Sequence, residues 1–356
     1  MLEQINQMLK IREENLSPYA TKSLDSANRE IPEQSSPLRN EFQRDRDRLV
    51  HSNAFRRLKH KTQVFIAPTG DHYVTRLTHT LEVSQIGRTI ARALNLNEDL
   101  VEAMTLGHDI GHTPFGHLGE DELNKLHKDG FNHAAQSVRI VEKLEKNGEG
   151  LNLTEVVKNG MRSHSKPKND LSGFLEKPSS LEAQICQISD AIAYLNHDIK
   201  DAIRAGLLSE DKIPDLCKRV LGHKHSQRID TMVTDIVSSS WDTTGLADIQ
   251  DTDPYIRMSE PVLEASNLLR EFMFENIYLP AGTGHIGDTA RRIMHLLYDY
   301  FSSQPEFIPN EYHLREEGSG IMAVDYVSGM TDYFALTKAE EIEPGITKGF
   351  LTHTII

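Results

Sequence analysis

Cysteine is scarce in this chain of 356 residues, and long apolar runs are missing from it. The two cysteines, Cys186 and Cys217, belong to no CxxC pair, which argues against a thiolate zinc site or a redox motif. No apolar run approaches the roughly 18 residues of a membrane-spanning helix. The first residues, MLEQINQMLKIREENL, lack the apolar core of a signal peptide. We therefore expect reduced, packed thiols, no membrane span and a cytoplasmic location.

Positive charge is also in short supply. The formal net charge of -14 argues against a protein that coats nucleic acid through a broad basic face. With 38% hydrophobic and 26% charged residues, the composition is typical of a soluble globular protein. Seven basic residues nevertheless gather in one short stretch, Arg44, Arg46, Arg48, Arg56, Arg57, Lys59 and Lys61. This run indicates a polyanion site or an interface, with a solvated helix face and internal ion pairs as the alternative.

The hydrophobic pattern predicts an all-α fold. Strand-like alternation is hard to find before the last third, whereas apolar residues recur at helical spacing over long stretches. The clearest helix carries Leu181, Ile185, Ile188, Ile192, Leu195, Ile199 and Ile203 at steps of three and four. We expect an N-terminal arm over residues 1–35 and a helical core over 36–205. Further helices, with room for a small β element, are expected over 206–356.

Histidine is the residue type that stands out, with 17 in the chain. The stretch GHDIGHTPFGH contains His108, Asp109, His112 and His117 within ten residues. Neighbours within a helix point about 100° apart, so His108 and Asp109 could not easily share one ion from mid-helix. The surrounding glycines permit a helix end where both side chains turn towards one point.

Imidazole and carboxylate ligands without thiolate favour a divalent ion such as Mn, Mg, Fe, Co or Ni over structural zinc. Two further ligands are then needed, and His79 and Asp190 are the best placed candidates. Asp190, Tyr194 and Asp198 share one face of the predicted helix, at i, i+4 and i+8. A solvated polar face is the alternative for these three residues, although the small neighbours of Asp190 argue against it.

The order His79, then His108 with Asp109, then Asp190 resembles the H...HD...D signature of the HD superfamily of metal-dependent phosphohydrolases. Three longer segments narrow the resemblance: RDRDRLVHSNAFRRLKHKTQVF (44–65), TRLTHTLEVSQIGRTIARAL (75–94) and GHDIGHTPFGHLGE (107–120). With FNHAAQS (131–137), they resemble the bacterial dGTPase-like deoxynucleotide triphosphohydrolases, relatives of the mammalian SAM-and-HD-domain dNTPase. The resemblance runs from about residue 36 to 204 and resumes at VDYVSGMTD (324–332).

The resemblance implies an HD-domain helical core whose metal ligands are His79, His108, Asp109 and Asp190. The ion is a divalent cation, with Mn, Mg, Fe, Co, Ni and Zn all in the expected range. Asp109, His112 and His133 would lie at the reacting centre, with His133 in acid and base chemistry. Ala134 follows His133 where relatives often carry Glu or Asn. A purely structural role is the alternative for His133.

The resemblance also implies a set of substrate contacts. Arg76, His112 and His117 match phosphate-contacting positions, where cations are required. Gln63 matches a sugar-contacting glutamine and Asp198 a carboxylate near the 3'-hydroxyl. Tyr194 matches a tyrosine under the deoxyribose, with ordinary packing as the alternative. The C-terminal VDYVSGMTDYFAL is expected to line or back the base pocket, and it has Tyr333 where relatives commonly carry Arg.

The implied activity is hydrolysis of dGTP or other deoxynucleoside triphosphates to a deoxynucleoside and triphosphate. One alternative is another HD phosphohydrolase acting on nucleoside monophosphates or guanosine alarmones. A second is a nucleotide sensor that binds without turnover, an alternative that Ala134 keeps open. Family members form dimers, tetramers or hexamers, and some require a nucleotide or single-stranded DNA effector. The resemblance therefore implies a homo-oligomer, for which the basic run could bind an effector, substrate or partner subunit.

Overall fold

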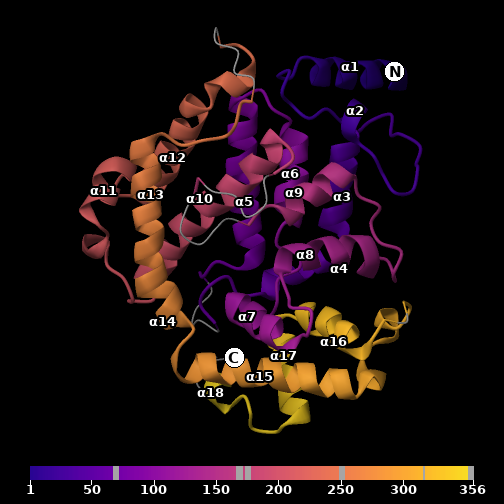
Figure 1. The fold of residues 1–356 in the computed structure, drawn as a ribbon, viewed down its shortest axis with the longest axis vertical. Coiled ribbons are helices and arrows are strands. Elements are labelled where there is room, and N and C mark those ends of the chain that lie inside the picture. Colours follow the sequence, from indigo (N-terminus) through magenta and orange to yellow (C-terminus); the bar gives the residue numbers. More distant parts are fainter. Residues whose placement is uncertain (67–71, 166–170, 173–177, 248–252, 316, 352–356) are drawn as a thin grey trace. The chain divides into compact units, whose positions relative to one another are not determined.

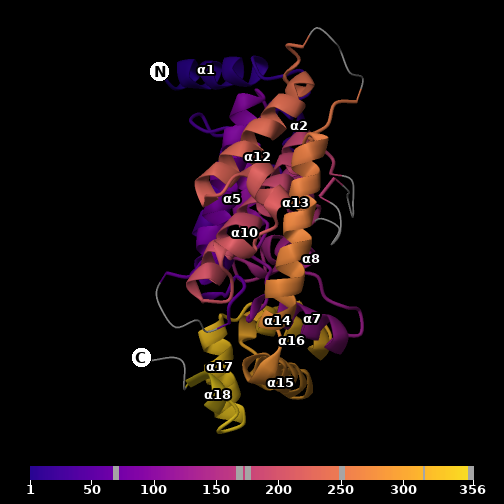
Figure 2. The same ribbon diagram turned by 90° about the vertical axis from the view of Figure 1, so that its left-hand side faces the viewer.

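The protein is built of helices, as the computed structural model in Figures 1 and 2 shows. The model describes residues 1–66, 72–165, 171–172, 178–247, 253–315 and 317–351. These residues contain no strand, and an isolated antiparallel bridge pairs Thr62 with Thr75. The all-α prediction is therefore confirmed, and the small β element allowed for 206–356 does not appear in the described part of that range. None of the described helices is long and apolar enough to cross a membrane.

The chain divides into two compact units whose segments alternate along the sequence. Unit 1 consists of residues 1–51, 80–108 and 152–273, and unit 2 of residues 52–79, 109–151 and 274–356. One boundary lies inside helix α5 (Arg76–Ala93), after its first turn, and another at the peptide bond between His108 and Asp109. The predicted arm, core and C-terminal region follow a different division, which stays a prediction.

Unit 1 is organised around one long central helix. Its helices, besides most of α5, are α1 (Leu2–Glu14), α2 (Ser23–Ser26), α3 (Glu41–His51), α6 (Glu98–Gly107), α9 (Glu155–Arg162), α10 (Leu181–Arg204), α11 (Asp215–Leu221), α12 (His225–Ser239) and α13 (Glu260–Met273). The predicted periodic helix is α10, which begins at a Ser180 cap whose side chain accepts from the Ala183 amide. Helix α10 packs against α6, α9, α12 and α13, and every member of its Leu and Ile stripe except Ile203 is buried. Figure 2 shows α10 between α5 and α13.

The end of α6 is fixed by close packing against α9. A methyl group at Gly107 would lie 2.8 Å from Sδ of Met161, and one at Gly160 would lie 2.4 Å from Sδ of Met104. Both glycines therefore allow the two helices to approach more closely than side chains would permit. Because α6 ends at Gly107, His108 follows directly at its C-terminus.

Unit 2 packs around α15 (Gly284–Ser303). Its other helices, besides the first turn of α5, are α4 (Asn53–Arg57), α7 (Gly116–Leu126), α8 (His133–Arg139), α14 (Leu279–Ala281), α16 (Ser319–Ser328), α17 (Asp332–Ile342) and α18 (Lys348–Leu351). Helix α15 contacts α7, α16 and α17, and they bury a core that includes Leu123, Leu297 and Val327 (Figure 1). Short helical turns complete the chain at Leu58–His60, Ile140–Leu144, Glu210–Lys212, Trp241–Thr244, Phe274–Tyr278, Pro305–Phe307 and Asn310–Tyr312.

The arginines of the basic run in unit 1 are engaged by acidic residues. Arg44 pairs with Glu33 at 2.6 Å and with Glu41 at 2.7 Å, and Arg48 also pairs with Glu33. Arg46 pairs with Asp47 and Glu102. For these three arginines the structure supports a helix face with internal ion pairs rather than an open polyanion site.

Glu33 provides a test of this network through the pH dependence of stability. Its carboxylate accepts from Arg44, Arg48 and the Asn152 side-chain amide. Burial alone would raise the pKa of Glu33, but the hydrogen bonds from Arg48 and Asn152 and both guanidinium charges lower it to about 2. Because the pKa falls on folding, this stabilisation is present above the ordinary pKa of 4.5 and is lost as the pH falls towards 2.

We expect Glu33→Gln to lower the free energy of unfolding at pH 7 by on the order of 1 kcal/mol, the scale of partly exposed ion pairs. The difference from wild type should shrink below pH 4.5 in urea titrations at stepped pH. Glu30→Gln, at an exposed position three residues before Glu33, is the control. A difference that stays constant with pH would contradict the assignment.

Candidate functional site

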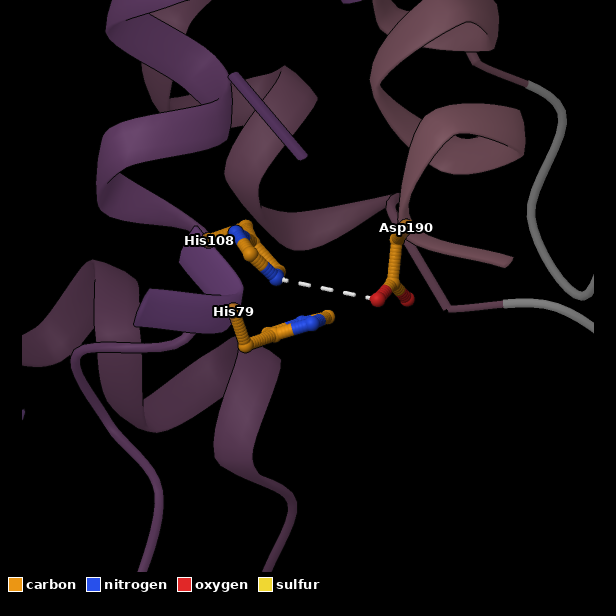
Figure 3. A group of neighbouring side chains, drawn as sticks. All are labelled: His79, His108 and Asp190. Atoms are coloured by element: carbon orange, nitrogen blue, oxygen red, sulfur yellow. Dashed lines mark ion pairs between the residues drawn. The ribbon is translucent and has the colours of Figure 1, made fainter. Parts of the chain in front are cut away.

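His108 and Asp190 approach each other in unit 1. Nε2 of His108, at the C-terminus of α6, lies 3.9 Å from Oδ1 of Asp190 on α10 (Figure 3). On the other side of the ring, Nδ1 lies 2.6 Å from the Thr105 carbonyl oxygen. Since a carbonyl only accepts, Nδ1 carries the hydrogen and Nε2 of the neutral ring is left as a ligand atom. The backbone of α6 thus orients the histidine towards Asp190.

A second buried histidine lies beside this pair. The ring of His164 is 4.9 Å from the ring of His108, edge to face, and its Nδ1 lies 2.7 Å from the Met161 carbonyl oxygen. His164 is 2% exposed, and sequence reasoning assigned it no role. Its orientation by a backbone carbonyl follows the same pattern as His108. The signal that could have found it is the SHS motif directly after α9.

His79 lies in the first turn of α5, and the other turns of that helix belong to unit 1. Figure 3 shows its ring beside His108 and Asp190. One ligand atom from each of these three residues lies within 4.8 Å of the others. The structure therefore brings together three of the four predicted metal ligands, two of them fully buried.

Asp109 is the next residue after His108, and its contacts in unit 2 are all with basic side chains. Oδ2 accepts from the Arg76 guanidinium at 2.6 Å and lies 3.8 Å from Nε2 of His79. Oδ1 lies 3.8 Å from Nε2 of His133. The Asp109 and Arg76 side chains are 5% and 1% exposed, so this ion pair is shielded from water.

The loop after α6 places His112 in the interior. Gly111 touches α8 so closely that a methyl group there would lie 2.3 Å from the Ser137 amide nitrogen. The ring of His112 stacks on His133 with centroids 4.2 Å apart, and it meets His117 edge to face. Burial lowers the pKa of His112 well below its ordinary value, and the charges of Arg76 and His133 add to this effect. His112 is thus a neutral imidazole at physiological pH.

His133 has a carboxylate partner that sequence reasoning missed. Glu120, on α7, lies 2.7 Å from Nδ1 of His133 and also accepts from the His133 amide at 2.8 Å. Burial alone would lower the pKa of His133, but the Glu120 carboxylate and the charge of Asp109 raise it above its ordinary value. Ala134, where relatives often carry a polar residue, is buried instead. The signal for Glu120 lay at the end of the GHLGE motif.

Several buried polar atoms of unit 2 have no hydrogen-bond partner among the described residues. They include Nε and the second terminal nitrogen of Arg76, both ring nitrogens of His112 and Oε1 of Gln63, besides Nε of Arg57 and the hydroxyl of Ser302. Buried polar groups are rarely left unpaired in native proteins, because each costs about 1–3 kcal/mol. His117, by contrast, is 72% exposed and reaches Glu120 at 3.3 Å.

Two of the three predicted sugar contacts, Tyr194 and Asp198, lie on α10 in unit 1. Asp198 is 2% exposed, and its Oδ1 lies 2.7 Å from Nδ1 of the neighbouring His197. Tyr194 packs against an apolar cluster that includes Leu171, and Arg270 lies over its ring at 5.9 Å. Burial raises the pKa of the Tyr194 hydroxyl. The phenol therefore remains protonated and can donate a hydrogen bond.

The C-terminal motif does not present Tyr333 to a pocket, since this side chain is 77% exposed. Other residues of the same motif point inward. Asp325 accepts from Gln136 and Arg139, and Asp332 accepts from the amides of Thr62 and Phe115. In unit 2, this motif therefore contacts the segments that carry His112 and Gln63.

The donor set fits a divalent cation. Metal bonds to imidazole and carboxylate are about 2.0–2.2 Å long, so one ion can bridge two donors up to about 4.2 Å apart. The pairs His108–Asp190 and His79–Asp109, at 3.9 and 3.8 Å, are too long for hydrogen bonds and meet this limit. Asp109, His112 and His133 form a second group of possible metal ligands.

Comparison with known proteins agrees with this geometry. The HD domain family matches residues 76–195, and the phosphohydrolase-associated domain matches residues 256–341. A deoxyguanosinetriphosphate triphosphohydrolase-like protein from Caldanaerobacter subterraneus subsp. tengcongensis is 51% identical over 92% of each chain. A protein of the same description from Desulfatibacillum aliphaticivorans is 45% identical over 92% of this chain and 94% of its own. The chain therefore belongs to the deoxyguanosinetriphosphate triphosphohydrolase-like family of HD-domain phosphohydrolases.

Proposed function

We propose that this protein hydrolyses deoxynucleoside triphosphates to a deoxynucleoside and inorganic triphosphate, with the help of a divalent ion. The observation that carries the proposal is the group of unpartnered buried donors on Arg76 and His112. These donors lie in the same unit as the acidic and basic pair of Glu120 and His133. A phosphate group supplies the acceptors that Arg76 lacks, and His133 supplies a proton beside it.

Four residues would hold the ion: His79, His108, Asp109 and Asp190. The distances within the pairs His108–Asp190 and His79–Asp109 support this set. When bound, a divalent ion supplies positive charge that polarises a phosphoryl oxygen. The hydrogen bond from His108 to the Thr105 carbonyl fixes which ring nitrogen faces the ion.

The reaction adds water to the alpha phosphorus and breaks its bond to the 5'-oxygen of the sugar. The leaving 5'-oxygen requires a proton, and the raised pKa of His133 favours the protonated imidazolium that can donate it. Glu120 orients the ring through Nδ1 and stabilises its charge, which leaves Nε2 facing Asp109. The proton that the attacking water loses returns His133 to its protonated form.

Arg76, His112 and His117 would bind the phosphates, and Gln63 the sugar. Arg76 keeps two unpaired nitrogens after its contact with Asp109, so it can bind Asp109 and a phosphate oxygen together. Tyr194 would pack beneath the deoxyribose, and Asp198 would accept from the 3'-hydroxyl. A site that hydrogen-bonds a substrate hydroxyl discriminates strongly against analogues that lack it.

Two other functions compete with this proposal. An HD phosphohydrolase for nucleoside monophosphates or alarmones would use the same four ligands, but the family relatives favour a deoxynucleoside triphosphate substrate. The argument for a nucleotide sensor was that Ala134 follows His133. The Glu120 carboxylate on His133 Nδ1 weakens that argument, because the chain retains an acidic partner for this histidine. Homo-oligomer formation, a nucleotide or DNA effector and a cytoplasmic location stay predictions from the resemblance.

Metal binding is tested by changing Asp190. We expect the wild-type protein to bind about one Mn²⁺ per chain in titration calorimetry, and Asp190→Ala to weaken binding at least about tenfold through loss of an anionic ligand. Asp230→Asn, at an exposed position on α12, is the matched control and should bind like wild type. Equal affinity in the Asp190 variant would remove this residue from the ligand set.

The reaction is tested by product analysis. Metal-loaded protein is incubated with each deoxynucleoside triphosphate, singly and mixed, beside Asp109→Ala. We expect deoxynucleoside and triphosphate from the wild type and loss of both from the variant, because Asp109 contacts Arg76 and lies next to His79 and His133. Monophosphate or diphosphate products would refute the proposal, whereas tight nucleotide binding without any product would support the sensor.

The acidic partner of His133 is tested with Glu120→Gln. This variant keeps the shape of the side chain but removes its charge, so His133 loses both its orientation and the stabilisation of its protonated form. We expect kcat to fall about 10- to 100-fold, with a smaller change in KM. Glu122→Gln, two residues along α7, serves as control. Unchanged kcat in Glu120→Gln would assign proton donation to another group.

A further inference from the structure

Lys61 is a buried lysine that has no carboxylate partner at hydrogen-bond distance among the described residues, which is unusual for a lysine. Its side chain is 1% exposed, and it precedes Gln63 by two residues. Nζ donates to the carbonyl oxygen of His112, and it donates at 2.8 Å to that of Ser328. One ammonium group therefore joins the loop after α6 to the end of α16.

Lys61 is also connected through its own backbone. Its carbonyl oxygen accepts from the amide of Arg76 at 3.1 Å, at the point where α5 begins. Thr62, the next residue, forms the isolated bridge with Thr75. Lys61 therefore contacts the chain on both sides of the proposed phosphate site, at the backbone of Arg76 and at that of His112.

Asp332 makes a second set of contacts beside it. One carboxylate oxygen accepts from the amide and the hydroxyl of Thr62, and the other accepts from the amide of Phe115 at 3.1 Å. Phe115 has a positive φ of 61°, which is unfavourable for a side-chain-bearing residue and must be stabilised by its surroundings. The carboxylate of Asp332 supplies one such contact at this turn.

These contacts have no direct role in the proposed chemistry. Both acceptors of Lys61 are main-chain carbonyls, and both oxygens of Asp332 are used by the backbone and Thr62. Lys61 and Asp332 both contact the backbone of the short loop between Asp109 and Gly116. That loop carries His112, and a displacement of about 1 Å at a reacting centre can cost about 100-fold in rate.

We propose that Lys61 and Asp332 are positioning residues. They hold the loop between Asp109 and Gly116, which carries His112, and the segment around Gln63 against the C-terminal motif of residues 324–332. The C-terminal motif thereby has a role within unit 2: it holds the backbone of the segments that carry the proposed phosphate-binding residues. We call these contacts of Lys61 and Asp332 the brace. Its expected effect on the reaction rate rests on the proposed function. Its effect on the loop itself is independent of the substrate.

The main test is Lys61→Met, which keeps the length of the side chain and removes its donors. We expect kcat on the preferred deoxynucleoside triphosphate to fall about 10- to 100-fold, with KM changing less than about threefold. Hydrogen exchange should accelerate in peptides covering residues 111–117 and 328–332. Peptides from α10 should exchange as in wild type.

The matched control is Lys158→Met in unit 1, since Lys158 is another buried lysine and pairs with Glu155 at 2.8 Å. It should leave kcat and the exchange of residues 111–117 unchanged. Asp332→Asn is the second variant, used also where Lys61→Met fails to fold. It leaves one acceptor and should change kcat and loop exchange in the same direction by a smaller factor.

Two outcomes would overturn the brace. One is wild-type kcat and wild-type exchange of residues 111–117 in Lys61→Met or Asp332→Asn. The other is faster exchange throughout the chain with a matching loss of thermal stability, which indicates general destabilisation. If the wild-type protein hydrolyses no deoxynucleoside triphosphate, the proposed function fails, and selective exchange of the loop then decides the brace by itself.

Discussion

The buried ion pair between Arg76 and Asp109 is the interaction on which the rest of the site depends. Two charges lose their hydration here, and removing either partner from such a pair typically costs about 3–5 kcal/mol, because the other charge remains buried. Arg76 precedes His79 by three residues on α5, and Asp109 follows His108. The pair thus fixes the start of α5 relative to the loop, and each partner is close in sequence to a predicted metal ligand.

This ion pair also leaves hydrogen-bond donors available at the site. Arg76 is planar and presents several N–H groups, and Asp109 uses those of one terminal nitrogen. The remaining nitrogens of Arg76 and both ring nitrogens of His112 are buried and accept or donate no hydrogen bond within the described part of the chain. Water is kept away from these donors, so an anion that reaches them gains more than it would at a hydrated surface. Arg44, Arg46 and Arg48 of the basic run differ from Arg76, because acidic side chains already engage all three.

Sequence reasoning predicted the features that depend on local pattern. The spacing of apolar residues correctly predicted α10, and the glycines around His108 correctly predicted a helix that ends there. Contacts between distant segments were not predictable in the same way. Glu120 on α7 reaches His133 at the start of α8 although the two residues lie 13 positions apart, and no periodicity encodes that contact. The Thr105 carbonyl that orients His108 is a backbone group, which the sequence does not distinguish.

The C-terminal motif shows how far a motif can be interpreted residue by residue. Its similarity to known relatives predicted a wall of the base pocket, but consecutive residues on a helix point about 100° apart and need not share a role. Tyr333 faces solvent, whereas the preceding Asp332 turns inward to the Phe115 amide. Asp325, one helix earlier, binds Arg139 and Gln136 on α8, and His133 begins that helix. The inward-facing residues of this motif thus contact the segments that carry His112, His133 and Gln63, whereas its most exposed residue contacts solvent.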